Sequence, residues 1–121
     1  MDFAHHPDSH FRYLTRADVI EAARGLDIVT VVAEALTLHS AGQSLLPEEA
    51  YLGWTTFRGD STRLPAMPGA LVRDGLPPVV GMKTINASIG NPFGMSVLGV
   101  AVADKVLARA EAADLGSRLT L

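Results

Sequence analysis

Residues 81–100, GMKTINASIGNPFGMSVLGV, change hydrophobic period within twenty positions, which limits the folds open to the chain. Up to Ser88 the residues alternate as in a strand: one face takes Val80, Met82, Thr84, Asn86 and Ser88, and the other takes Gly81, Lys83, Ile85 and Ala87. From Phe93 the period is helical, with a stripe of Val97, Val100, Ala103, Val106, Leu107 and Ala110. Only a Gly-Asn-Pro turn separates the two patterns, so we expect a strand followed closely by a helix.

Two helices are predicted in the N-terminal third. Thr15 can cap the first, with Asp18 in the capping-box position, and Gly25 ends it. Asp27 can cap the second, over 28–42. The apolar face of this second helix consists of Ile28, Val31, Val32, Ala35, Leu36 and His39.

Extended segments are predicted at 11–15, 49–57, 62–72, 78–89 and 117–121. Prolines 65 and 68 suggest that segment 62–72 is bulged or lies at a sheet edge. The order of elements predicts an α+β fold, in which helices pack on one face of a mostly antiparallel (mixed) sheet. We expect a flexible lead at 1–10 and a single domain over 11–121.

Composition excludes several classes of function. With 48% hydrophobic and 19% charged residues, the chain is too apolar to be disordered. The formal net charge of −3 and the lack of a Lys/Arg cluster argue against a nucleic-acid partner. No cysteine is present, and neither a membrane span nor a signal-peptide core is recognisable, so we expect a cytoplasmic protein with no membrane partner.

Five motifs in order carry a resemblance to a known family: YLTRADVI, LLPEEAYLGW, LPAMPGAL, GMKTINASIGNP and ARAEAADLGSRLTL. Together they resemble the ornithine cyclodeaminase and mu-crystallin family, above all its diaminopropionate-pathway branch of NAD-dependent dehydrogenases. The resemblance implies a substrate-binding and dimerisation domain. In that family a Rossmann domain is inserted between the two pieces of this domain. Here piece 11–90 would join piece 93–121 directly, near 90–93.

The resemblance implies NAD as the cofactor of the parent family, but this chain is expected to bind none. A dinucleotide site needs a glycine-rich turn between a strand and a helix. The sequence holds no G-x-G-x-x-G, and Gly90, Gly94 and Gly99 have the wrong spacing. We therefore expect no redox activity from this chain.

Lys83, Glu49 and Arg63 are the leading candidate substrate-binding residues. The resemblance implies that Lys83 holds a substrate carboxylate; alternatively, it is a solvent-facing lysine on an edge strand. Glu49 stands where cyclodeaminases have an arginine after L-P-P, which would suit a substrate amino group; alternatively, it is a solvated turn residue. Arg63 could bind a carboxylate or pair with Asp60. Tyr51 and Asn86 are further candidates.

Other polar residues are not expected to carry chemistry. His5, His6 and His10 lie in the polar lead, where zinc ligands would lack a rigid frame, so no metal site is predicted. His39 is predicted to be a hydrogen-bonded boundary residue. Gly99 replaces an acidic residue usual in the family tail, and it either relieves close packing or removes a carboxylate.

Three functions remain open. The first is a dimeric module, or a higher homo-oligomer, that binds an amino-acid-like small molecule without turnover. The second is a small non-redox enzyme at a dimer interface, with Lys83 as cation or base and Glu49 as proton carrier. The third is a subunit that a separate Rossmann protein completes.

Overall fold

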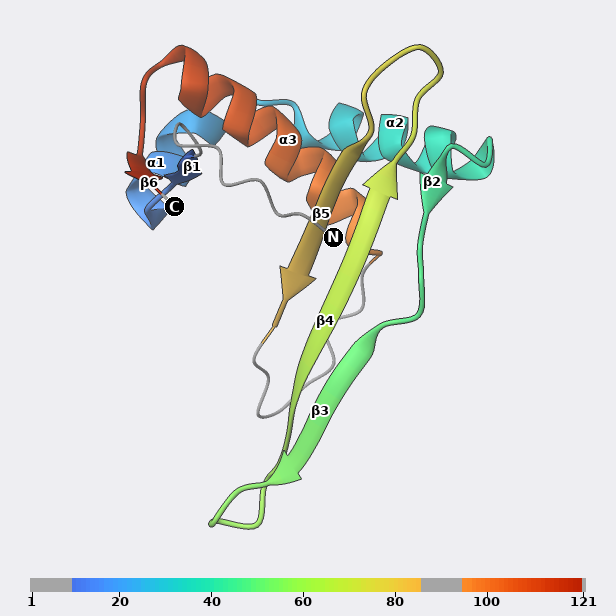
Figure 1. Cartoon of the computed structure of the whole chain (residues 1–121), viewed down its shortest axis with the longest axis vertical. Helices are drawn as coiled ribbons and strands as arrows, with labels where there is room; N and C mark the ends of the chain where they lie inside the picture. The colour runs from blue at the N-terminus through green and yellow to red at the C-terminus, as the bar shows by residue number, and fades with distance from the viewer. Residues whose placement is uncertain (1–9, 86–94, 121) are drawn as a thin grey trace. The chain divides into compact units, whose positions relative to one another are not determined.

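The computed structural model describes residues 10–85 and 95–120 (Figure 1). Over these residues the chain has three helices and two antiparallel sheets, which confirms the predicted α+β class. The chain divides into two compact units, Met1–Leu26 with Lys105–Leu121 and Asp27–Asp104. The predicted single domain over 11–121 stays a prediction, and the junction at 90–93 lies outside the described residues.

The larger unit contains a four-stranded antiparallel sheet built around β4 (Ser61–Leu71). On one side of β4 lie β2 (Ser44–Leu45) and β3 (Ala50–Thr55), and on the other lies β5 (Val79–Thr84). The proline-containing segment is therefore the middle strand, not the bulged or edge strand that the sequence suggested.

The two prolines of β4 lie where a neighbouring strand ends or is interrupted. The amide of Ile85 donates to the carbonyl of Pro65 at 3.3 Å, so the nitrogen of Pro65 points to the β5 side and away from its β3 partner, Tyr51. Pro68 points the other way, into the break where β2 has ended and β3 has not begun. The hydroxyl of Ser96 donates to the carbonyl of Pro68 at 2.8 Å. Pro68 is tolerated because no strand pairs with its nitrogen, and Pro65 because β5 ends at Thr84, one residue before Ile85.

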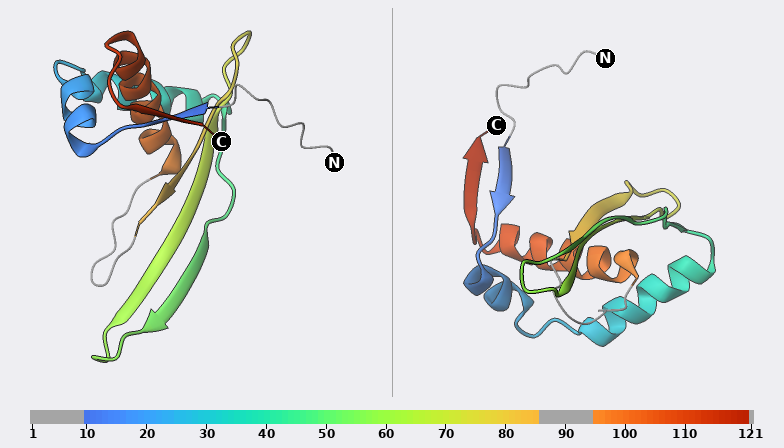
Figure 2. Two further views of the ribbon diagram at one scale, coloured as in Figure 1. Left: turned by 60° about the vertical axis from the view of Figure 1, so that its left-hand side comes forward. Right: turned by 90° about the horizontal axis from the view of Figure 1, so that it is seen from below.

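Two helices of this unit lie against one face of the sheet, α2 (Ile28–Ser40) and the first half of α3 (Ser96–Ala112) (Figure 2). The buried apolar residues of the unit are Val31, Ala35, Ala70, Leu71, Val97, Val100 and Ala101. Apart from Ala70, which alternation places on the other side of β4, they come from both helices and from Leu71 of β4, so the core lies between the helices and the end of the sheet that carries β5.

The opposite end of the sheet is a hairpin of β3 and the first half of β4, which extends beyond the helices (Figure 1). Every residue of β3 is exposed, on both faces of the strand. Tyr51, Leu52 and Trp54 are among them. A two-stranded ribbon with both faces in water is only marginally stable. The hairpin therefore lacks the cover that strands of this composition usually have.

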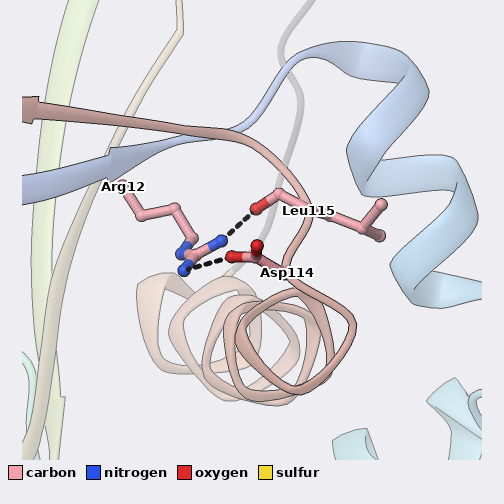
Figure 3. Close-up of polar contacts among 3 residues, drawn as sticks. All are labelled: Arg12, Asp114 and Leu115. Atoms are coloured by element: carbon pink, nitrogen blue, oxygen red, sulfur yellow. Dashed lines mark hydrogen bonds and ion pairs between the residues drawn. The ribbon is translucent and has the colours of Figure 1, made fainter.

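The smaller unit combines β1 (His10–Tyr13), α1 (Arg16–Ala23), the second half of α3 and β6 (Ser117–Thr120). Strands β1 and β6 form a two-stranded antiparallel sheet. Arg12, which is almost fully buried, donates to the carbonyl of Leu115 and pairs with Asp114 at 3.5 Å (Figure 3). These contacts fasten the turn after α3 to β1.

The helix starts follow the sequence prediction closely. Thr15 and Asp18 form the predicted capping box: the amide of Thr15 donates to the Asp18 carboxylate at 2.8 Å, and the amide of Asp18 donates to the Thr15 hydroxyl at 3.2 Å. Asp27 caps α2 by accepting from the amide of Thr30 at 3.1 Å. The predicted faces are confirmed only in part, because Ile28, Leu36, His39, Ala103 and Leu107 are exposed.

Candidate functional site

The register of the sheet places three of the predicted substrate-binding residues on one face. Lys83 lies opposite Met67, Tyr51 opposite Pro65, and Arg63 opposite Gly53. Strand alternation sets these positions on the same side as Gly69 and Gly81, against which α3 packs. We call this side the helix face; it comprises Tyr51, Gly53, Arg63, Pro65, Met67, Gly69, Leu71, Val79, Gly81 and Lys83.

Lys83 is half-buried, with its stem against α3. A Cβ atom at Gly99 of α3 would lie 3.7 Å from the Cδ atom of Lys83. Within 10–85 and 95–120 the ion pairs are Arg12–Asp114 and Arg24–Glu21, so Lys83 has no acidic partner there. The stem therefore lies beside the helix, while the ammonium group is not neutralised by a described residue.

Tyr51 and Arg63 continue the helix face along the hairpin. The ring of Tyr51 lies beside Gly53, because a Cβ atom there would be 3.5 Å from the Cε2 atom of the ring. Gly53 is the register partner of Arg63, so no side chain of β3 stands directly opposite Arg63. Arg63 is half-buried and makes no ion pair with Asp60 or any other described residue, against the predicted alternative.

Glu49 and Asn86 are not brought to this group. Glu49 is exposed and precedes β3, in the break between β2 and β3, where no ladder pairing fixes its direction. In the described part of the chain, no hydrogen bond or ion pair joins it to Lys83. Asn86 lies outside the described residues. The face therefore carries two cationic side chains and a phenol, spread along β4 between the positions of Arg63 and Met67, and each cation can pair with an anionic group.

The other side of the same sheet has a different character. Along β3, β4 and β5, alternation gathers eleven residues there: Ala50, Leu52, Trp54, Thr62, Leu64, Ala66, Pro68, Ala70, Val80, Met82 and Thr84. None of the eleven is charged. The large members are exposed, from 40% for Leu64 to 72% for Val80. We call this side the apolar face, and it lies opposite the helices.

Sequence reasoning identified Val80, Met82 and Thr84 as sharing a side, but it missed the apolar face as a surface. The signal lay in AYLGWT, where Leu52 and Trp54 are two residues apart, as are Val80 and Met82 in β5. Joining these pairs into one surface requires the register across β4, which the sequence does not state.

A hollow of about 400 Å³ in the smaller unit offers no comparable site. Arg109 lines it, but its guanidinium group already donates to the carbonyl of Ala22 at 2.6 Å and to that of Arg24. Arg24 in turn pairs with Glu21 at 2.9 Å. The polar groups of the hollow thus serve to fasten the C-terminal end of α1.

The remaining predictions concern histidines and membranes. His39 is bonded through Nδ1 to the hydroxyl of Ser44 at 2.7 Å, which confirms a hydrogen-bonded residue at the end of α2. No three metal-ligating side chains gather within the described ranges, while His5 and His6 lie outside them. None of the helices described has the length and apolarity that crossing a bilayer requires.

No protein-family model matches this sequence, and no curated protein matches it. Among solved structures, the crystal structure of CmnK is similar to the chain, with 40% sequence identity and a TM-score of 0.61. The similarity covers 69% of this chain and 25% of CmnK. The chain therefore matches only about a quarter of the length of that protein.

Proposed function

We propose that this chain is a self-associating, amino-acid-binding domain of the ornithine cyclodeaminase and mu-crystallin type, close to the NAD-dependent dehydrogenases of the diaminopropionate pathway. In this proposal it binds no NAD and performs no hydride transfer, since its sequence holds no glycine-rich phosphate-binding turn. The order of its motifs supports the family, and the partial match to a longer protein accords with a domain that is one part of a larger architecture.

The observation that carries self-association is the exposure of the apolar face. Leu52, Val80 and Met82 are each more than 60% exposed, and Trp54 and Leu64 lie on the same side. Large contiguous apolar surfaces are uncommon on monomeric soluble proteins and mark interaction sites. The hairpin at one end of this face is uncovered, so a partner that packed on it would stabilise it.

A second copy of the chain is the partner that this surface fits best. The eleven residues of the apolar face include no charge, so two identical faces can meet about a two-fold axis without like-charge repulsion. The fully buried core of an interface is poor in charged residues, as this face is. A two-fold contact would also cover the exposed side of both hairpins at once.

The ligand is proposed to be an amino-acid-like small molecule held on the helix face. Lys83 and Arg63 can each pair with a carboxylate, and the phenol of Tyr51 can donate a further hydrogen bond. No observation favours the alternative enzyme that uses Glu49 as proton carrier, because Glu49 and Lys83 do not meet among the described residues. A separate Rossmann subunit stays a prediction.

The test of self-association uses two variants. Met82→Lys places a charge in the centre of the apolar face, where burial would be unfavourable, and it should weaken association by about a hundredfold. Val29→Lys is the matched control, because Val29 is 79% exposed on α2. Sedimentation velocity over a concentration series measures both variants. Equal behaviour of the two variants would contradict the proposed interface.

A further inference from the structure

Gly99 lies in the first turn of α3, and its environment differs from that of the sheet glycines. A Cβ atom at Gly69 would lie 2.5 Å from the Ser96 hydroxyl, and one at Gly81 would lie 2.9 Å from a methyl group of Val100. At Gly99 the nearest atom is the Cδ atom of Lys83, at the ordinary contact distance of 3.7 Å. Close packing therefore explains Gly69 and Gly81, but it does not explain Gly99.

A side chain at position 99 would change the surroundings of Lys83. A Cβ atom at Gly99 would contact the lysine stem at Cδ, two bonds from Nζ. A carboxylate there could come within ion-pair distance of Nζ. In the described part of the chain Lys83 has no acidic partner, so its charge is not already neutralised.

We propose that Gly99 keeps the ammonium group of Lys83 unpaired and available to a carboxylate of the ligand, which makes Gly99 a positioning residue of the helix face. The proposal rests on the ligand site assigned above. It deepens that assignment by explaining how the binding lysine stays free although a helix packs against its stem. The recognised group is a carboxylate, as in an amino acid.

The experiment compares three substitutions that differ in charge and size. Gly99→Asp adds a carboxylate, Gly99→Asn adds a side chain of nearly the same shape without charge, and Gly99→Ala adds only the Cβ atom. Binding of glutamate is followed by NMR chemical-shift titration of the full chain. Gly99→Asp should weaken binding by about tenfold, because it competes for the ammonium group. Gly99→Asn and Gly99→Ala should stay within about twofold. Equal weakening by Gly99→Asp and Gly99→Asn, or no weakening by Gly99→Asp, would overturn the proposal.

A second measurement separates this inference from the proposed ligand. If the unaltered chain bound no glutamate, the proposed function would fail while the inference could still be judged by a double-mutant cycle on unfolding. Gly99→Asp and Lys83→Met should then be coupled by about threefold in the unfolding equilibrium constant, as expected for a partly exposed ion pair. The cycle of Gly99→Asn with Lys83→Met should be additive. Additivity in both cycles would show that position 99 does not reach the ammonium group, and the inference would be wrong.

Discussion

Gly69 of β4 and Gly81 of β5 are direct register partners, and α3 packs on both of them. Ser96 lies over Gly69, where its hydroxyl reaches the carbonyl of Pro68, and Val100 lies over Gly81 one turn later. The helix approaches the sheet this closely because neither glycine has a side chain. This pair fixes where α3 crosses the helix face, and so where Lys83 meets Gly99.

The first prediction concerns this contact. Gly81→Ala should lower the free energy of unfolding by about 1–3 kcal/mol, because the added methyl group would overlap the Val100 side chain. Urea denaturation measures the change. The double substitution Gly81→Ala with Val100→Ala should recover part of the loss. It removes the Val100 methyl group that would lie 2.9 Å from the added carbon at position 81. Unchanged stability of the single variant would contradict the close approach.

Gly99→Ala should act in the opposite direction. Gly99 is exposed within α3, and a Cβ atom there makes an ordinary contact. Alanine is favoured over glycine inside a helix by about 1 kcal/mol, so the variant should be more stable by an amount of that order. The same denaturation measurement tests this, with Gly81→Ala as the contrasting substitution. A destabilised Gly99→Ala variant would mean that close packing does require a glycine there.

The capping residues predict a dependence of stability on pH. The side-chain hydrogen bond from Thr15 lowers the pKa of Asp18, and its backbone amide adds to this. The hydroxyl of Thr30 likewise lowers the pKa of Asp27, with the Thr30 amide second. Because both carboxylates have a pKa below that of the unfolded chain, their stabilisation is present above about pH 4 and is lost as pH falls through the folded pKa.

Asp27→Asn is the matched variant for this effect, because asparagine can still cap a helix but does not titrate in this range. Its stability should change less than that of the unaltered chain between about pH 5 and pH 2. Thermal unfolding at a series of pH values measures the difference. Identical acid dependence of the two proteins would show that the Asp27 cap has no part in it.

Local signals made the helix starts predictable, whereas tertiary contacts decided the rest. Thr15, Asp18 and Asp27 act on amides within one turn, so sequence spacing alone specifies their bonds. Leu36 and Leu107 fit the helical period but are exposed, because the period does not say how much of a face a neighbour covers. The central position of β4 was not predicted, because two prolines are unusual in a central strand. The residues at which the neighbouring strands end make these prolines acceptable, and they cannot be derived from the local sequence.

The candidate site shows the same division. The alternation of residues along the strand was enough to predict that Lys83 and Met82 lie on opposite faces of the sheet. That Tyr51 and Arg63 share the side of Lys83 follows only from the pairings with β4, and the contact of Lys83 with α3 follows only from the helix crossing. Glu49 could not be placed by pattern, because the break between β2 and β3 interrupts the alternation.

The central claim is that the apolar face is covered by a second copy of the chain. Sedimentation equilibrium of the unaltered protein at micromolar concentrations tests it most directly. The account predicts a mass of at least twice the 12.8 kDa of one chain, lowered towards the single-chain mass by Met82→Lys. A mass of one chain throughout the micromolar range would contradict it.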